Sequence, residues 1–137
     1  MNVGRGIERM SWIQKLFGVG PDCLSPYLYS IPQVSDALHN LWGNVQLTNA
    51  HNEYLNSFVC YGIVGLASWL TVLAGGIRYF YGEAKKNSYM IAFALCIAGY
   101  ACHNIFCYQQ VCCTPILFIA LGIGESLTKS ENFNTIK

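Results

Sequence analysis

The sequence has 137 residues, of which 53% are hydrophobic and only 11% are charged, whereas an ordinary soluble domain has about 25% charged residues. Eight Lys and Arg residues nearly balance seven Asp and Glu residues, which leaves a net charge of +1. This balance excludes the basic surface on which most nucleic-acid-binding proteins depend, so we expect no nucleic-acid partner. The composition is instead typical of a membrane protein.

The charged residues leave two long gaps in the sequence. Glu53 and Arg78 enclose 24 uncharged residues, and Lys86 and Glu125 enclose 38. Because a membrane-spanning helix needs about 20 predominantly apolar residues, the first gap holds one span and the second can hold two. We therefore predict an all-α, polytopic membrane protein. Its three transmembrane helices are expected at about residues 54–77, 88–108 and 111–127.

The orientation follows from the positive charges. The loop at residues 78–87 carries one arginine and two lysines, and positive charge in a short loop marks the cytoplasmic side. We therefore expect the turn at residues 108–110 outside and the tail at residues 128–137 in the cytoplasm. The same orientation makes residues 1–53 an extracytoplasmic loop segment of mostly helical or irregular structure.

No hydrophobic segment precedes residues 1–53 that could anchor or translocate them. We therefore expect the chain to be the carboxy-terminal part of a larger polytopic protein, working with its missing N-terminal helices or as a homo-oligomer. The alternative is a self-contained three-span protein with a polar N-terminal arm.

Seven cysteines raise the alternatives of a disulfide framework and a metal site. Six of them lie in or at the edge of the apolar stretches, where cysteine packs as a small apolar residue, and only Cys23 lies in a polar segment. The spacing lacks the paired CxxC elements of a structural zinc site. We therefore predict packing thiols and no metal site.

A polar patch at residues 49–54 (NAHNEY) precedes the first predicted span and contains His51. A histidine with an ordinary pKa of about 6.5 accepts a proton at neutral pH, and a nearby carboxylate such as Glu53 can orient it. Residues two apart on a helix do not face each other, so contact between these two side chains needs a non-helical turn. The alternative is an interfacial histidine with a structural role.

A second patch at residues 4–6 (GRG) places Arg5 between two glycines, with Arg9 four residues later. Flanking glycines leave room for a phosphate, and the planar guanidinium matches phosphate with two hydrogen bonds. The alternative is an ordinary charged surface.

Three elements in order carry a resemblance to a known family. They are residues 4–6 (GRG) with the downstream Trp12, residues 16–22 (LFGVGPD), and residues 50–55 (AHNEYL) followed by residues 61–66 (YGIVGL). The set resembles the O-antigen ligase and polymerase family of bacterial membrane glycosyltransferases, over residues 4–70. A second His-Asn pair begins at His39, but the context of residues 50–55 favours His51.

The resemblance implies transfer of a glycan from a polyprenyl pyrophosphate carrier to a sugar hydroxyl of a glycan acceptor, without metal or other cofactor. The reaction would occur at the outer face of the bacterial plasma membrane, whose lipid surrounds the multi-pass chain. His51 would be the general base, and Arg5 would bind the pyrophosphate and stabilise the leaving group. Arg9, Asn52 and Glu53 are the predicted substrate-binding residues.

One alternative to an enzyme is a catalytically inactive, truncated paralogue or a small non-enzymatic helical membrane protein. If the chain is an enzyme, the sequence is compatible with both a ligase and a polymerase. The aromatic side chains of Tyr27, Tyr29 and Trp42 could stack on sugar rings or form an aromatic belt at the membrane interface.

Overall fold

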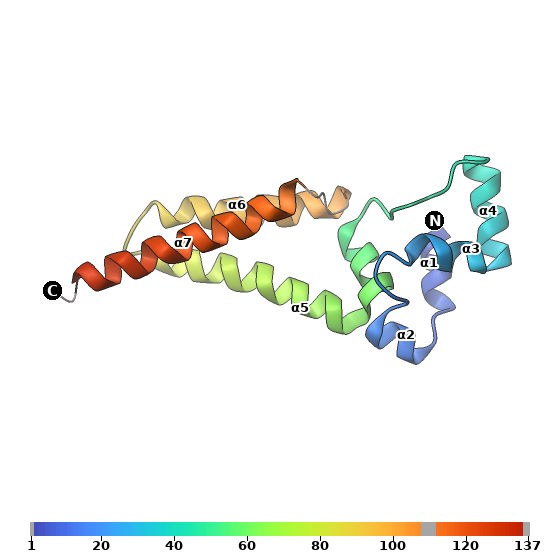
Figure 1. Cartoon of the computed structure of the whole chain (residues 1–137), viewed down its shortest axis with the longest axis horizontal. Helices are drawn as coiled ribbons and strands as arrows, with labels where there is room; N and C mark the ends of the chain where they lie inside the picture. The colour runs from blue at the N-terminus through green and yellow to red at the C-terminus, as the bar shows by residue number, and fades with distance from the viewer. Residues whose placement is uncertain (1, 108–111, 136–137) are drawn as a thin grey trace. The chain divides into compact units, whose positions relative to one another are not determined.

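The computed structural model describes residues 2–107 and 112–135, and these residues form seven helices and no strand (Figure 1). The predicted all-α fold class is therefore confirmed. The described residues divide into two compact units. The first unit contains residues 2–69 and 104–107, and the second contains residues 70–103 and 112–135.

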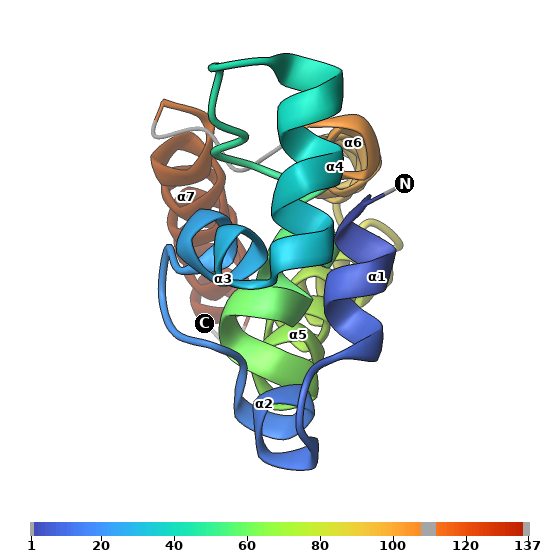
Figure 2. The ribbon, with the colours of Figure 1, turned by 90° about the vertical axis from the view of Figure 1, so that its right-hand side faces the viewer.

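The first unit is built on four short helices, and it also contains the N-terminal part of α5 (Glu53–Glu83). The short helices are α1 (Asn2–Glu8), α2 (Trp12–Phe17), α3 (Leu24–Ser30) and α4 (Pro32–Trp42). Helices α1, α3 and α4 pack against one another (Figure 2). Their buried residues form a core with two residues of α5, and this core contains Val3, Leu24, Leu28, Val34, Leu38, Val59 and Cys60.

The sequence explains why these helices form. Leu24 and Leu28, like Val34 and Leu38, are four residues apart, so each pair lies on one face of its helix and is buried. Pro32 starts α4, where its fixed φ suits the first turn and its missing N–H costs no hydrogen bond. Residues 2–42 are thus mostly helical, and residues 43–52 form an irregular segment that leads to α5.

Helix α5 is broken at Gly62, which has φ 70° and ψ −170°. This combination is essentially restricted to glycine. In an unbroken helix, the carbonyls of Val59 and Cys60 would accept hydrogen bonds from residues 63 and 64. They accept instead from the N–H groups of Val19 (2.9 Å) and Gly20 (3.0 Å).

Two glycines allow this close approach of backbones. A Cβ atom at Gly18 would overlap the backbone of Cys60, and a Cβ atom at Gly62 would overlap the backbone of Leu16. The turn at residues 18–20 therefore caps the broken helix end with its own N–H groups.

The second unit contains the C-terminal part of α5, most of α6 (Met90–Phe106) and α7 (Cys113–Thr135). Helix α7 approaches α5 and α6 closely at Gly124, because a Cβ atom there would lie 2.6 Å from Phe80 and 3.2 Å from Phe93. The two phenylalanine rings lie 5.4 Å apart. The fully buried side chains of this unit are those of Phe80, Met90, Ile97 and Leu117.

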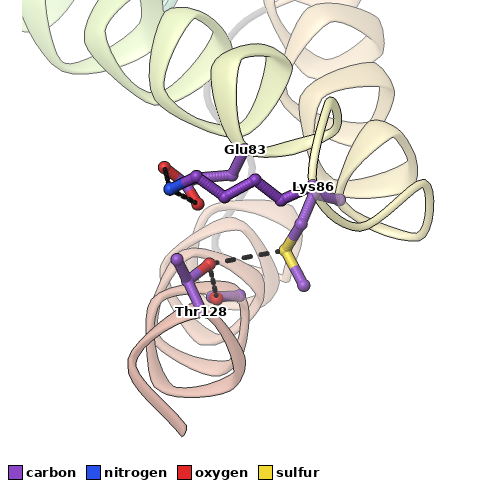
Figure 3. Close-up of polar contacts among 5 residues, drawn as sticks. Glu83, Lys86 and Thr128 are labelled. Carbon is purple, nitrogen blue, oxygen red and sulfur yellow. Dashed lines mark hydrogen bonds and ion pairs between the residues drawn. The ribbon is translucent and has the colours of Figure 1, made fainter. Parts of the chain in front are cut away.

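Polar contacts add to this packing at one end of the second unit (Figure 3). The Thr128 hydroxyl donates to the Gly124 carbonyl (3.0 Å) and also contacts the Met90 sulfur at 3.5 Å. At the C-terminal end of α5, Lys86 forms an ion pair of 3.1 Å with Glu83.

Helices occupy all three predicted span positions, but their ends differ from the prediction. Helix α5 continues to Glu83 instead of ending at residue 77, α6 starts two residues later than predicted, and α7 continues through most of the predicted tail to Thr135. The predicted ends follow the limits of the uncharged runs in the sequence. A charged residue ends such a run, but it does not end a helix. The predicted outer turn at residues 108–110 and the start of the third span at residue 111 lie outside the described residues.

One helix of the described part, α5, is long and apolar enough to cross a membrane. Helix α6 is apolar but has 17 residues, and at 1.5 Å per residue it is about 25 Å long. The structure therefore supports an all-helical protein with one candidate membrane-spanning helix.

Candidate active site

His51 lies in the segment between α4 and α5 and is exposed. Its φ of 50° places it in the left-handed region, which histidine visits more often than most residues but which is still uncommon. The chain is therefore non-helical at His51, two residues before α5 begins. A cavity of about 110 Å³ lies beside it and is lined by Trp42, Val45, Gln46, Leu47, Thr48 and His51.

Asn52 is the N-cap of α5. Its side-chain oxygen accepts a hydrogen bond from the Leu55 N–H (3.0 Å), and its side-chain nitrogen donates to the carbonyl of Ile105 (2.9 Å). An N-cap asparagine satisfies a helix donor that would otherwise have no partner. Asn52 therefore joins the start of α5 to the C-terminal end of α6.

Glu53 begins α5 and is 2% exposed. Its carboxylate accepts a hydrogen bond from the Ser57 hydroxyl (2.9 Å), and its N–H donates to the carbonyl of Cys107 (3.1 Å). A carboxylate in the first turn is also stabilised by the helix dipole. The N–H contact therefore holds the end of α6 against the start of α5, whereas the carboxylate contact lies within α5.

Arg5 and Arg9 are exposed, Arg5 on α1 and Arg9 just beyond it. Among the described residues, neither arginine makes a hydrogen bond or an ion pair with His51, Asn52 or Glu53. The structure thus places the predicted site residues in two groups of the same unit, one at α1 and one at the start of α5.

The backbone around Arg5 is held by α3. The Tyr27 hydroxyl donates to the carbonyl of Gly6 (2.9 Å), and a Cβ atom at Gly6 would overlap Leu28. Burial raises the pKa of Tyr27, and the nearby positive charge of Arg9 opposes this rise. One glycine beside Arg5 is therefore used for helix packing, whereas Gly4 is open.

The second histidine candidate, His39, has a structural role. Its Nδ1 lies 3.1 Å from the carbonyl of Gly43, next to the end of α4, and its ring lies 5.4 Å from that of Tyr29. The Tyr29 hydroxyl in turn accepts a hydrogen bond from the Leu47 N–H (3.1 Å). These contacts position the segment that leads to His51.

Sequence reasoning missed several polar residues near the start of α5. Gln46 and Thr48 line the cavity beside His51, although nothing in their local sequence distinguishes them. Ser57 and Asn104 are buried, and the Asn104 amide has no hydrogen-bond partner among the residues that the structure describes. For Asn104, the available signal was a polar amide side chain within an apolar helix.

The cysteines show no sign of a metal or disulfide framework in the part of the chain that the structure describes. Cys60 is buried in the core of the first unit, as expected of a packing thiol. Cys96, Cys102 and Cys112 are exposed, so they do not pack within this chain.

The three motif elements all lie in the first unit. The second and third, at residues 16–22 and 50–66, meet through the backbone hydrogen bonds of Val19 and Gly20 to α5. The first, at residues 4–6, is held by Tyr27 of α3. No protein-family model, curated protein or solved structure matches the chain.

Proposed function

We propose that this chain is an O-antigen ligase- or polymerase-like membrane glycosyltransferase, or its carboxy-terminal part. It would transfer a glycan from a polyprenyl pyrophosphate carrier to a sugar hydroxyl at the outer face of the bacterial plasma membrane. The observation that carries the proposal is the joining of two motif elements. The turn at residues 18–20 and the break at Gly62 are 40 or more residues apart, yet their backbones form one assembly in the unit that also presents His51.

The chemistry follows from the residues available. The His51 imidazole would take the proton of the acceptor hydroxyl while the oxygen of that hydroxyl bonds to the anomeric carbon of the donor. The bond from that carbon to the carrier pyrophosphate breaks, and the carrier leaves with the electron pair. Arg5 would stabilise the charge on this leaving group. The exposed indole of Trp42, beside the same cavity, suits the apolar face of a sugar ring.

The membrane setting rests on the surface of α5. In the most apolar stretch of this helix, only 22% of the residues are buried. The core helix of a soluble protein would be buried on most sides, whereas a helix that faces lipid exposes its apolar side chains. We propose that α6 and α7 cross with it as the second and third spans, which leaves residues 1–53 outside.

The alternative is a non-enzymatic or inactive chain that keeps the motif. One observation favours it, because the side chain of Asn52, one of the five predicted site residues, caps α5 and joins it to α6. The Glu53 carboxylate is likewise buried and accepts a hydrogen bond from Ser57 of the same helix. A sequence signature can therefore persist for structural reasons alone.

The test is complementation of a ligase- or polymerase-deficient strain with the full chain. We choose His51→Asn because asparagine tolerates positive φ and cannot act as the base. His103→Asn makes the same change in another His-Asn pair, at an exposed position of α6 that does not line this cavity, and is the matched control. Restored surface glycan that falls about 100-fold or more in the His51 variant alone supports the proposal.

Equal membrane insertion of all variants is checked by immunoblotting. No restoration from a well-inserted unmodified chain would contradict activity of the chain by itself and favour the alternative. Equal restoration by the His51 variant would remove His51 from the reaction.

A further inference from the structure

Helix α2 presents an unusually apolar surface. Four of its six residues are large apolar side chains, and none of the six is buried. The exposed fractions are 82% for Trp12, 73% for Ile13, 46% for Leu16 and 65% for Phe17. Single exposed apolar residues are ordinary, but a contiguous group of this kind marks an interaction surface.

The helix is held in a defined place. Ser11 and Gln14 form a capping box, with hydrogen bonds of 3.3 Å and 2.9 Å between their side chains and each other's N–H groups. At its C-terminal end, the Gly18 N–H donates to the Gln14 carbonyl (2.7 Å). Beyond this residue, the chain is joined to α5 by the backbone hydrogen bonds of Val19 and Gly20. The exposed side chains are therefore presented by an anchored element.

Helix α2 lies at the point where the apolar part of α5 begins. The backbone of Leu16 and Phe17 touches Gly62, and residues 63–83 form one continuous helical segment after it. At 1.5 Å per residue, these 21 residues are about 31 Å long, which is enough to cross the hydrocarbon core of a bilayer. Arg78 and Glu83 lie in the last two turns of this segment, from which long charged side chains reach the far interface. If this segment crosses a membrane, Gly62 lies at the interface and α2 lies at the same level.

Within the first unit, α2 and α4 lie on opposite sides of the first turns of α5 (Figures 1 and 2). None of the exposed apolar residues of α2 lines the cavity beside His51, which α4 helps to form. The surface is distinct from the candidate active site.

We propose that α2 is an interfacial membrane anchor that rests in the lipid headgroup region where α5 enters the bilayer. Tryptophan is favoured at that depth, and the Leu16 and Phe17 side chains would reach the start of the acyl chains. The Lys15 amine lies 5.3 Å from the centre of the Trp12 ring, and its flexible stem allows it to reach lipid phosphates. The proposal uses the candidate span and does not depend on glycan transfer.

The experiment determines the depth of Trp12 in the membrane from the quenching of its fluorescence. The full chain with Trp42→Phe and Trp69→Phe keeps Trp12 as its one tryptophan and is reconstituted in phosphatidylcholine and phosphatidylglycerol vesicles. Brominated lipid replaces phosphatidylcholine in a second preparation, and acrylamide is added to both. We expect strong quenching by bromine near the headgroup end of the acyl chains and weak quenching by acrylamide.

The matched control carries Trp12→Phe and Trp69→Phe and keeps Trp42, which is 54% exposed on α4. Its emission should be quenched by acrylamide and unaffected by bromine. Quenching of Trp12 by acrylamide alone would overturn the proposal, because α2 would then face water. Quenching by neither reagent would also overturn it, in favour of a protein partner that covers α2.

A second measurement needs no substitution. A photoreactive group carried on lipid acyl chains should label residues 12–17 in the unmodified chain and leave α4 unlabelled. Labelling of α4 without α2 would contradict the proposal even if the tryptophan variants failed to fold.

Discussion

Asn52 combines two tasks in one side chain, since it caps α5 and also reaches the Ile105 carbonyl of α6. Asn52→Ser should keep the cap but lose the longer contact, at a cost of about 0.5–1.5 kcal/mol. Asn52→Ala should lose both, and the missing cap adds about 0.5–2 kcal/mol. Thermal unfolding in detergent, followed by circular dichroism, measures this order of stability. Equal stability of the two variants would show that the cap contributes nothing.

The residues proposed for the reaction were predictable from local pattern, but their surroundings were not. His51 precedes an apolar run in the sequence, and the structure places it in an exposed turn beside a cavity. Glu53 is a carboxylate of the kind that can orient a histidine such as His51, yet it is buried and accepts a hydrogen bond from Ser57. The difference arises because residue type indicates what a side chain can do, whereas burial depends on residues 105–107 folding back onto the start of α5.

At the scale of the elements, the break in α5 has a direct test. Gly62→Ala places a Cβ in a conformation that costs about 1–3 kcal/mol, and the Cβ would also overlap the backbone of Leu16. Gly75→Ala in the same helix is the matched control, because no atom lies within 4 Å of the new Cβ. Alanine there should gain about 0.5–1 kcal/mol. The thermal midpoints should therefore shift in opposite directions, and a shared direction would contradict the break.

The positions of the long helices follow from the sequence, whereas their ends and the break do not. An apolar run indicates a helix by its composition, and a glycine inside the run leaves that signal unchanged. The break at Gly62 depends on the N–H groups of Val19 and Gly20, which are 40 residues away along the chain from their acceptors. Helix α5 also continues past Arg78, because arginine and glutamate are good helix formers and do not end a helix.

At the scale of the whole molecule, the proposed three-span arrangement predicts a cytoplasmic loop around the C-terminal end of α5. Arg78, Lys85 and Lys86 carry the charge bias that sets this orientation. A green fluorescent protein fused after residue 87 should fluoresce, and alkaline phosphatase at the same site should be inactive. Replacing the three basic residues by glutamine should produce a mixed orientation. Phosphatase activity from the unmodified chain at this site would contradict the topology.

The sequence by itself determined that the chain is helical, where its long helices lie, and that a histidine precedes the first of them. These properties are local, because composition and the spacing of apolar residues control helix formation and burial over a few turns. The tertiary structure decided that α5 is broken, that Asn52 and Glu53 hold the end of α6, and that α2 is exposed. The break and the contacts with α6 join residues 40–54 apart along the chain, and the exposure of α2 depends on what the rest of the fold leaves uncovered. Only the folded backbone could therefore reveal them.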